Sequence, residues 1–101
     1  MAKWADYGIY AVRFNVLRTH IDRVRAMPDS GDSFGSSVEM ARTEVISAIK
    51  RGVTFVTIIK DTDGKWKLGS KVFIVTINGT EYIKTVNDNT AKDNLDNLPE
   101  F

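Results

Sequence analysis

Apolar residues recur at every second position along most of this chain, and a single segment repeats them at helical spacing. Residues 7–16 place Tyr10, Val12, Phe14 and Val16 on one face, which is typical of a half-buried strand. A weaker alternation over 20–27 follows after a short break. The two stretches therefore indicate a β-hairpin.

The segment at helical spacing follows a concentration of turn-forming residues at 28–37, which we expect to be a surface loop. Its apolar residues recur every three or four positions: Val38, Ala41, Val45, Ala48 and Ile49. Gly52 marks its end, because glycine readily adopts the left-handed conformation that closes a helix. Its start has two alternatives. A capping-box pattern at Ser36 favours an early start, whereas an extended lead-in would place the first turn near Arg42.

The second half of the chain returns to strand patterns. Residues 53–60 are β-branched and aromatic on both parities, which predicts a central strand. After a loop that includes 65–67, residues 71–77 predict another strand that is buried on both faces. Asn78-Gly79 predicts a type I′ turn, because both central positions of that turn need a positive φ. Residues 80–85 are then the returning strand.

The element order β-β-α-β-β-β predicts an α+β fold, in which one amphipathic helix covers a mainly antiparallel sheet of about five strands. A length of 101 residues suits a single domain over 1–101. Residues 85–101 form an acidic tail with three apolar anchors. We expect this tail to dock on the body through Leu95, Leu98 and Phe101.

Several functional classes are excluded by residue content. The chain has no cysteine and one histidine, His20, which excludes thiolate zinc sites, iron–sulfur clusters, cysteine nucleophiles and multi-histidine metal sites. We expect no cofactor and no metal. No apolar run approaches the ~20 residues of a transmembrane helix, and the start lacks the pattern of a secretion signal. We therefore expect a cytoplasmic protein without a membrane partner.

The overall charge of +1 is unevenly distributed along the chain. Residues 1–27 carry a net +3 and residues 42–84 a net +4, whereas residues 28–41 and 85–101 each carry a net −3. A basic body with two acidic segments suits an anionic partner.

Arg13, Arg23 and Arg25 are the main candidates for binding that partner. Arg13 has the parity opposite to the apolar set of its strand, and the other two are spaced by two residues, so all three are predicted to share one sheet face. Such a face can hold phosphate or acidic protein. The alternatives are an ordinary charged strand face and neutralisation by acids of the tail, namely Asp93, Asp96 and Glu100.

Two further candidates are weaker. Lys65, Trp66 and Lys67 place an aromatic ring between two cations, which could stack on a base while neutralising phosphate. The alternative is that Trp66 fills the edge of the core. His20 lies near Asp22, so a histidine–carboxylate pair of a small hydrolase is conceivable, against a solvated turn histidine.

Several segments together are similar to one family: Glu44-Val45-Ile46, Thr54-Phe55-x-Thr57, Asn78-Gly79-x-x-Tyr82-Ile83-Lys84-Thr85 and the closing Asp93-Asn94-Leu95-Asp96-Asn97-Leu98-Pro99-Glu100-Phe101. The chain resembles the small bacterial and phage domain-of-unknown-function 3892 family over nearly its whole length. No activity is established for that family. The resemblance implies that the chain is complete and that the tail belongs to the domain. Lys84 departs from the arginine that is common there.

The preferred interpretation is a non-enzymatic binding domain that engages an anionic protein, nucleotide or nucleic acid through the arginine face. The alternative is a protein–protein interaction domain of a phage or mobile element, with a role in counter-defence. A small hydrolase that uses His20 is the third hypothesis. The oligomeric state is not indicated by the sequence.

Overall fold

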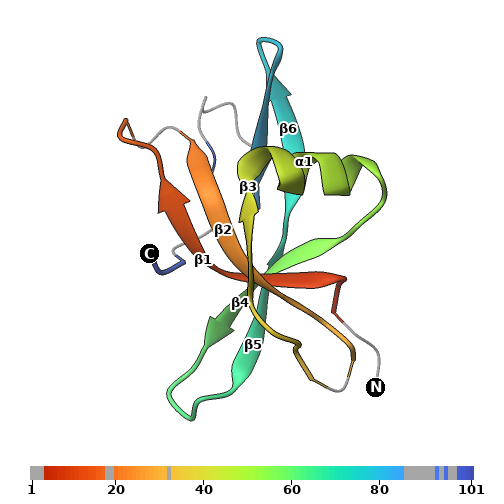
Figure 1. The fold of residues 1–101 in the computed structure, drawn as a ribbon, viewed down its shortest axis with the longest axis vertical. Coiled ribbons are helices and arrows are strands. Elements are labelled where there is room, and N and C mark those ends of the chain that lie inside the picture. The colour runs from red at the N-terminus through yellow and green to blue at the C-terminus, as the bar shows by residue number, and fades with distance from the viewer. Residues whose placement is uncertain (1–3, 18–19, 32, 86–92, 94, 96–97) are drawn as a thin grey trace.

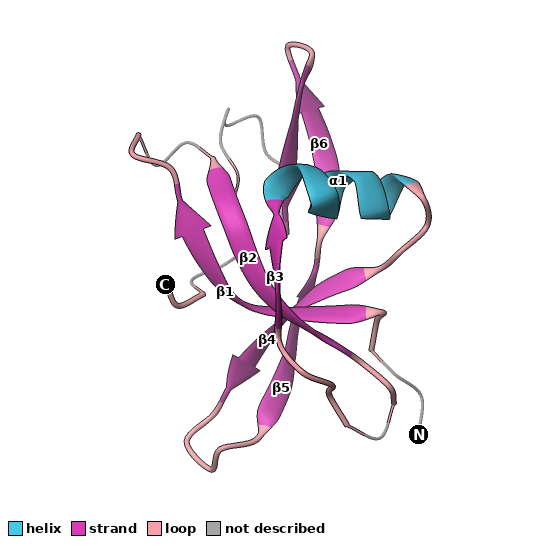
Figure 2. Ribbon diagram, in the orientation of Figure 1, coloured by secondary structure: helices cyan, strands magenta, loops and turns pink. Residues whose placement is uncertain are grey.

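The computed structural model describes residues 4–17, 20–31, 33–85, 93, 95 and 98–101. In these residues the elements are β1 (Tyr7–Phe14), β2 (Ile21–Pro28), β3 (Val38–Ala41), α1 (Arg42–Lys50), β4 (Phe55–Lys60), β5 (Trp66–Lys71), β6 (Phe73–Ile77) and β7 (Thr80–Lys84). The fold is α+β, as predicted, with a single short helix among the strands (Figure 2). Among the described residues no helix has the length and apolarity to cross a bilayer.

The strands form two sheets. A five-stranded sheet has the order β3-β2-β1-β4-β5, and β6 and β7 form a separate hairpin. The β4–β5 and β6–β7 hairpins extend toward opposite ends of the molecule (Figure 1). The C-terminus lies beside β1, so the last residues of the chain return to its first strand (Figure 1).

The prediction of a mainly antiparallel sheet is wrong, because the five-stranded sheet is mixed. β1 pairs in parallel with β4, from Tyr7 opposite Phe55 to Ile9 opposite Thr57, whereas its other neighbour β2 is antiparallel. α1 connects β3 to β4, and a helical crossover of this kind delivers the next strand in parallel orientation. Periodicity along one segment carries no information about which strand it pairs with.

The structure resolves where the helix begins. Residues 38–41 are the edge strand β3, which pairs with β2, and α1 starts at Arg42. The later of the two predicted starts is therefore correct. Glu44 accepts a hydrogen bond from the Ala41 N–H at 3.0 Å, which stabilises the first turn. Gly52 ends the helix with a φ of 93°, as predicted.

The predicted strand at 71–77 is divided in two. Residues 66–71 are β5 rather than a loop, and the chain then bends at Val72, whose N–H donates to the Phe55 carbonyl at 2.9 Å. β6 is half-buried instead of buried on both faces, because it leaves the main sheet. The hairpin turn is confirmed, since Asn78 and Gly79 both have positive φ, 51° and 81°.

The main core lies between one face of the five-stranded sheet, α1, the β6–β7 hairpin and the tail. Its buried members include Ile9, Val12, Val24, Val45, Phe55, Ile83, Leu95 and Leu98. Leu95 and Leu98 of the tail are thus part of the core. Burial of each large apolar side chain contributes roughly 1.5–3 kcal/mol.

A β-bulge in β1 changes the predicted face of one aromatic residue. The pairing with β2 runs from Ile9 to Ala11 with Tyr10 as the extra residue. The bulge shifts the alternation, so Ile9 and Val12 both face the main core. Tyr10 instead packs in a second apolar cluster with Trp66. Its grouping with Val12 on one face is therefore wrong. The grouping of Val16 with that face is also wrong, because β1 ends at Phe14 and Val16 is 98% exposed.

Candidate functional site

The three candidate arginines lie together on one face of the β1–β2 hairpin. Arg13 pairs directly opposite Arg23 in the strand register, and Arg25 is two residues further along β2. Directly opposed residues share a face, as do residues two apart on one strand. All three side chains are exposed, whereas Val12 and Val24 between them point into the core. We call Arg13, Arg23 and Arg25 the arginine face.

Phe101 lies on the arginine face. The guanidinium carbons of Arg13 and Arg25 lie 5.0 and 4.2 Å from the centre of its ring. Arg13 Nε also donates to the Phe101 carbonyl at 3.0 Å. Each exposed cation–π contact contributes roughly 0.5–1 kcal/mol. The end of the chain therefore holds two of the three arginines in fixed orientations.

Arg23 has a partner on the neighbouring edge strand. Its Nη1 lies 3.4 Å from Glu39 Oε2 on β3, and both side chains are close to half exposed. A surface ion pair of this kind contributes only about 0–1 kcal/mol. The Arg23 guanidinium is therefore only weakly held by Glu39.

The last residues reach this face through a free edge of β1. β4 pairs with β1 only as far as Ile9, so the following part of that edge has no strand beside it. There the Val12 N–H donates to the Pro99 carbonyl at 2.9 Å, and the Phe101 N–H donates to the Val12 carbonyl at 3.0 Å. The tail thus adds a short parallel bridge to β1.

Asp93 does not follow the alternative in which tail acids neutralise the three arginines. Its buried carboxylate accepts hydrogen bonds from the Ile21 and Ile83 N–H groups at 2.7 and 2.9 Å and pairs with Arg42 Nε at 2.7 Å. It therefore joins β2, β7 and α1. Asp96 lies outside the described residues.

The second candidate group is separate from the arginine face. β4 lies between β5 and β1 in the sheet. Trp66 packs on Tyr10 and Phe34, with ring centres 5.6 and 6.3 Å away, and so fills the second apolar cluster. Lys67 Nζ lies 3.2 Å from Asp61 Oδ2, and Lys65 is exposed. The structure favours a packing role for Trp66.

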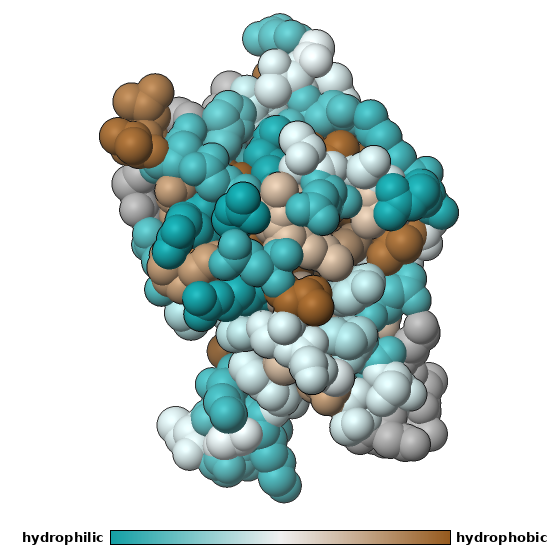
Figure 3. All heavy atoms as spheres, viewed as in Figure 1, coloured by the Kyte–Doolittle hydropathy of each residue, from teal (hydrophilic) through white to brown (hydrophobic). Residues whose placement is uncertain are grey.

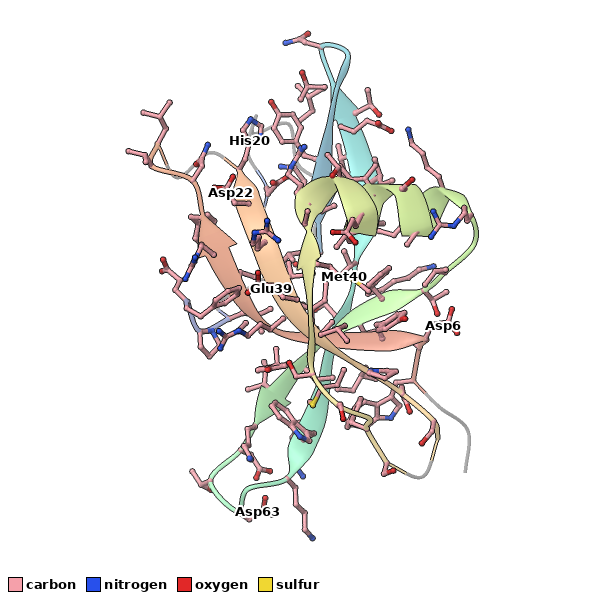
Figure 4. All side chains as sticks on the ribbon, in the orientation of Figure 1. Asp6, His20, Asp22, Glu39, Met40 and Asp63 are labelled. Carbon is pink, nitrogen blue, oxygen red and sulfur yellow. The ribbon has the colours of Figure 1, made fainter. Side chains whose placement is uncertain are left out.

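His20 lies in a different setting from the one expected. Figure 4 shows it at the start of β2, near Asp22. Its ring stacks on Tyr82 at 5.4 Å between centres, and its Nδ1 is 3.9 Å from Asp93 Oδ2. Within the described part of the chain Nδ1 is buried without a hydrogen bond. Among the described residues no hydroxyl is therefore positioned against Nδ1 for nucleophilic catalysis.

A groove of about 390 Å³ lies between α1 and the β6–β7 turn. Its two cations already have partners. Arg42 pairs with Asp93, and Lys50 Nζ lies 2.7 Å from Glu81 Oε2. Within the described ranges no three metal-ligating side chains gather. The arginine face is therefore the better candidate for a binding site.

Sequence reasoning missed the role of Phe101 at this face. The residue was expected only as an apolar anchor, because its contact with Arg13 depends on the edge of β1 that β4 leaves free. A terminal aromatic residue in a tail rich in Asn and Asp was the available signal.

Comparisons with known proteins are consistent with the resemblance found in the sequence. A family model described as Protein of unknown function (DUF3892) matches residues 8–99. No curated protein and no solved structure matches the chain. The matched range includes the three arginines and the tail as far as Pro99, whereas Phe101 lies two residues beyond it.

Proposed function

This chain belongs to the DUF3892 family, whose function is unknown, and we propose that it is a non-enzymatic domain that binds an anionic partner through the arginine face. The observation that supports this proposal is the register of the β1–β2 hairpin, which sets Arg13 opposite Arg23 with Arg25 beside them. Like charges directly opposed across a sheet are destabilising. Their presence on an exposed face is explained by a partner that neutralises them.

The chemistry of this face suits phosphate or carboxylate groups. A guanidinium presents several N–H donors in a planar fork that matches both kinds of anion. The strands hold the three side chains on a rigid element, which lowers the entropy lost on binding. The partner is accordingly a protein with acidic side chains, a nucleotide or a nucleic acid.

The test is a binding titration with fluorescent single-stranded RNA and DNA, a nucleoside triphosphate and an acidic peptide at low and high salt. Binding through this face weakens as salt screens the charges. Arg23→Gln should weaken binding about fivefold, because one surface charge contact contributes about 1 kcal/mol.

Arg51→Gln is the matched control, since Arg51 is an exposed arginine just after α1. It should leave the affinity unchanged. Equal loss in the two variants would point to nonspecific attraction, and a lack of binding to every probe at low salt would remove the support for an anionic partner.

A second candidate, a protein–protein interaction domain of a phage or mobile element, is supported by the tip of the β1–β2 hairpin. Val16 and Leu17 are 98% and 79% exposed. Figure 3 shows an apolar projection at this end of a largely hydrophilic surface. Light scattering and pull-down separate the two candidates. A complex that is lost in Val16→Ser with Leu17→Ser but kept in Arg23→Gln would favour protein–protein docking.

A further inference from the structure

The described tail residues fall into two parts that are held differently. Asp93, Leu95 and Leu98 are 2%, 2% and 7% exposed and belong to the interior. Pro99 and Glu100 are exposed, and Phe101 is half-buried on the arginine face. Pro99 and Phe101 are attached to the body through hydrogen bonds with Val12 and through contacts with Arg13 and Arg25. This end of the chain can therefore detach while the inner part stays in the core.

We propose that residues 99–101 are a displaceable latch that regulates the arginine face, an inference that rests on the proposed anionic partner. The latch and the partner compete for the same groups. Arg13 Nε donates to the Phe101 carbonyl, so a two-pronged anion contact that uses this edge of the guanidinium requires the carbonyl to leave. The ring of Phe101 also sets the position of Arg25.

The size of the effect follows from linkage. When the binding-competent state is a minor one, the apparent dissociation constant is the intrinsic one divided by the fraction of open molecules. Each exposed cation–π contact is equivalent to about a twofold to fivefold change in that fraction. Loss of both contacts in Phe101→Ala should then raise the affinity for the partner about fourfold to twenty-fivefold.

The experiment compares wild type, Phe101→Ala and Phe101→Tyr for binding to a single-stranded oligonucleotide and to an acidic peptide. Phe101→Tyr keeps an aromatic ring under the guanidinium groups and should bind as wild type does. Thermal melting of the three proteins shows whether the inner tail remains docked, and all three should melt alike to within a few degrees.

Amide hydrogen exchange gives a second readout that does not depend on affinity. The Val12 and Phe101 N–H groups both form hydrogen bonds of the latch, so their exchange should become faster when the probe binds. Tighter protection on binding, or equal affinities of wild type and Phe101→Ala, would overturn the latch and leave the proposed function in place. If neither wild type nor Phe101→Ala binds any anionic probe, the latch and the proposed function both fail.

Discussion

Asp93 and Arg42 lie 51 positions apart in the sequence, and their side chains form an ion pair of 2.7 Å inside the fold. The Asp93 carboxylate is completely buried, and the Arg42 side chain is 19% exposed. Arg42 also donates to the Glu81 carbonyl. The first residue of α1, the strand β7 and the tail are therefore joined at one point, which fixes the chain that continues toward the arginine face.

Loss of the Asp93 carboxylate should strongly destabilise the domain. Asp93→Ala leaves Arg42 without its partner and two backbone N–H groups without an acceptor, and breaking a buried ion pair costs about 3–5 kcal/mol. Chemical denaturation measures the free energy of unfolding. Asp22→Ala, at an exposed carboxylate, is the control and should change it by less than about 0.5 kcal/mol. Equal effects of the two substitutions would contradict the role of Asp93.

Docking of the tail can be measured at Leu98. Leu98→Ala should lower the free energy of unfolding by about 2–5 kcal/mol, because it leaves a cavity in the core. Leu68→Ala makes the same chemical change at a side chain that is 52% exposed, and its effect should be much smaller. If the two variants unfold at the same denaturant concentration, the tail is not part of the core.

The hairpin tip should be replaceable without loss of stability. Val16 and Leu17 are largely exposed, so Val16→Ser with Leu17→Ser removes almost no buried apolar area. The melting temperature should stay within a few degrees of wild type. A large fall in melting temperature would show that the tip is covered in solution.

Asp61 should contribute to the stability of the domain in a pH-dependent way. Hydrogen bonding with Asp63, together with nearby Lys67, holds the pKa of Asp61 below its ordinary value of 3.8. A carboxyl whose pKa is lowered by folding stabilises the protein above its unfolded-state pKa, and this stabilisation is lost as the pH falls through the lower folded-state pKa. Asp61→Asn should therefore melt below wild type at neutral pH.

The same comparison at low pH supplies the check on that sign. The difference in melting temperature should be present above pH 3.8 and should shrink as the pH falls through the lower folded-state pKa, because the wild-type carboxyl then also becomes uncharged. A difference that grows with acidity would contradict the assignment. Asn suits the substitution because its side-chain oxygen keeps the turn hydrogen bond that Asp61 accepts from the Asp63 N–H.

Local signals in the sequence predicted those features that depend on neighbouring residues. The Asn78-Gly79 turn and the end of the helix at Gly52 were predictable, because both need a positive φ that few residue types adopt readily. The shared face of Arg13 and Arg23 was also predictable from a local signal, because the alternation of residues along each strand decides which face a side chain lies on.

Features that depend on distant parts of the chain were not predictable. The parallel pairing of β1 with β4 follows from the path of α1, and the bulge at Tyr10 shifts the alternation without a local mark. The contact of Phe101 with Arg13 depends on the extent of that parallel pairing, because the free edge of β1 begins only where β4 has diverged. The Phe101 part of the candidate site therefore depends on tertiary packing, which local sequence signals do not specify.

The most direct test of the arginine face is the salt dependence of binding to a single-stranded oligonucleotide. Each neutralised phosphate contributes about −0.7 to the slope of log K against log salt. Three arginines therefore predict a slope of about −2 for wild type. The triple variant Arg13→Gln, Arg23→Gln and Arg25→Gln should show weak binding and a slope near zero. The control is a second triple variant, Arg51→Gln with Lys67→Gln and Lys71→Gln, which should keep the wild-type slope. A triple arginine variant that binds with the wild-type affinity and slope would contradict the proposed function.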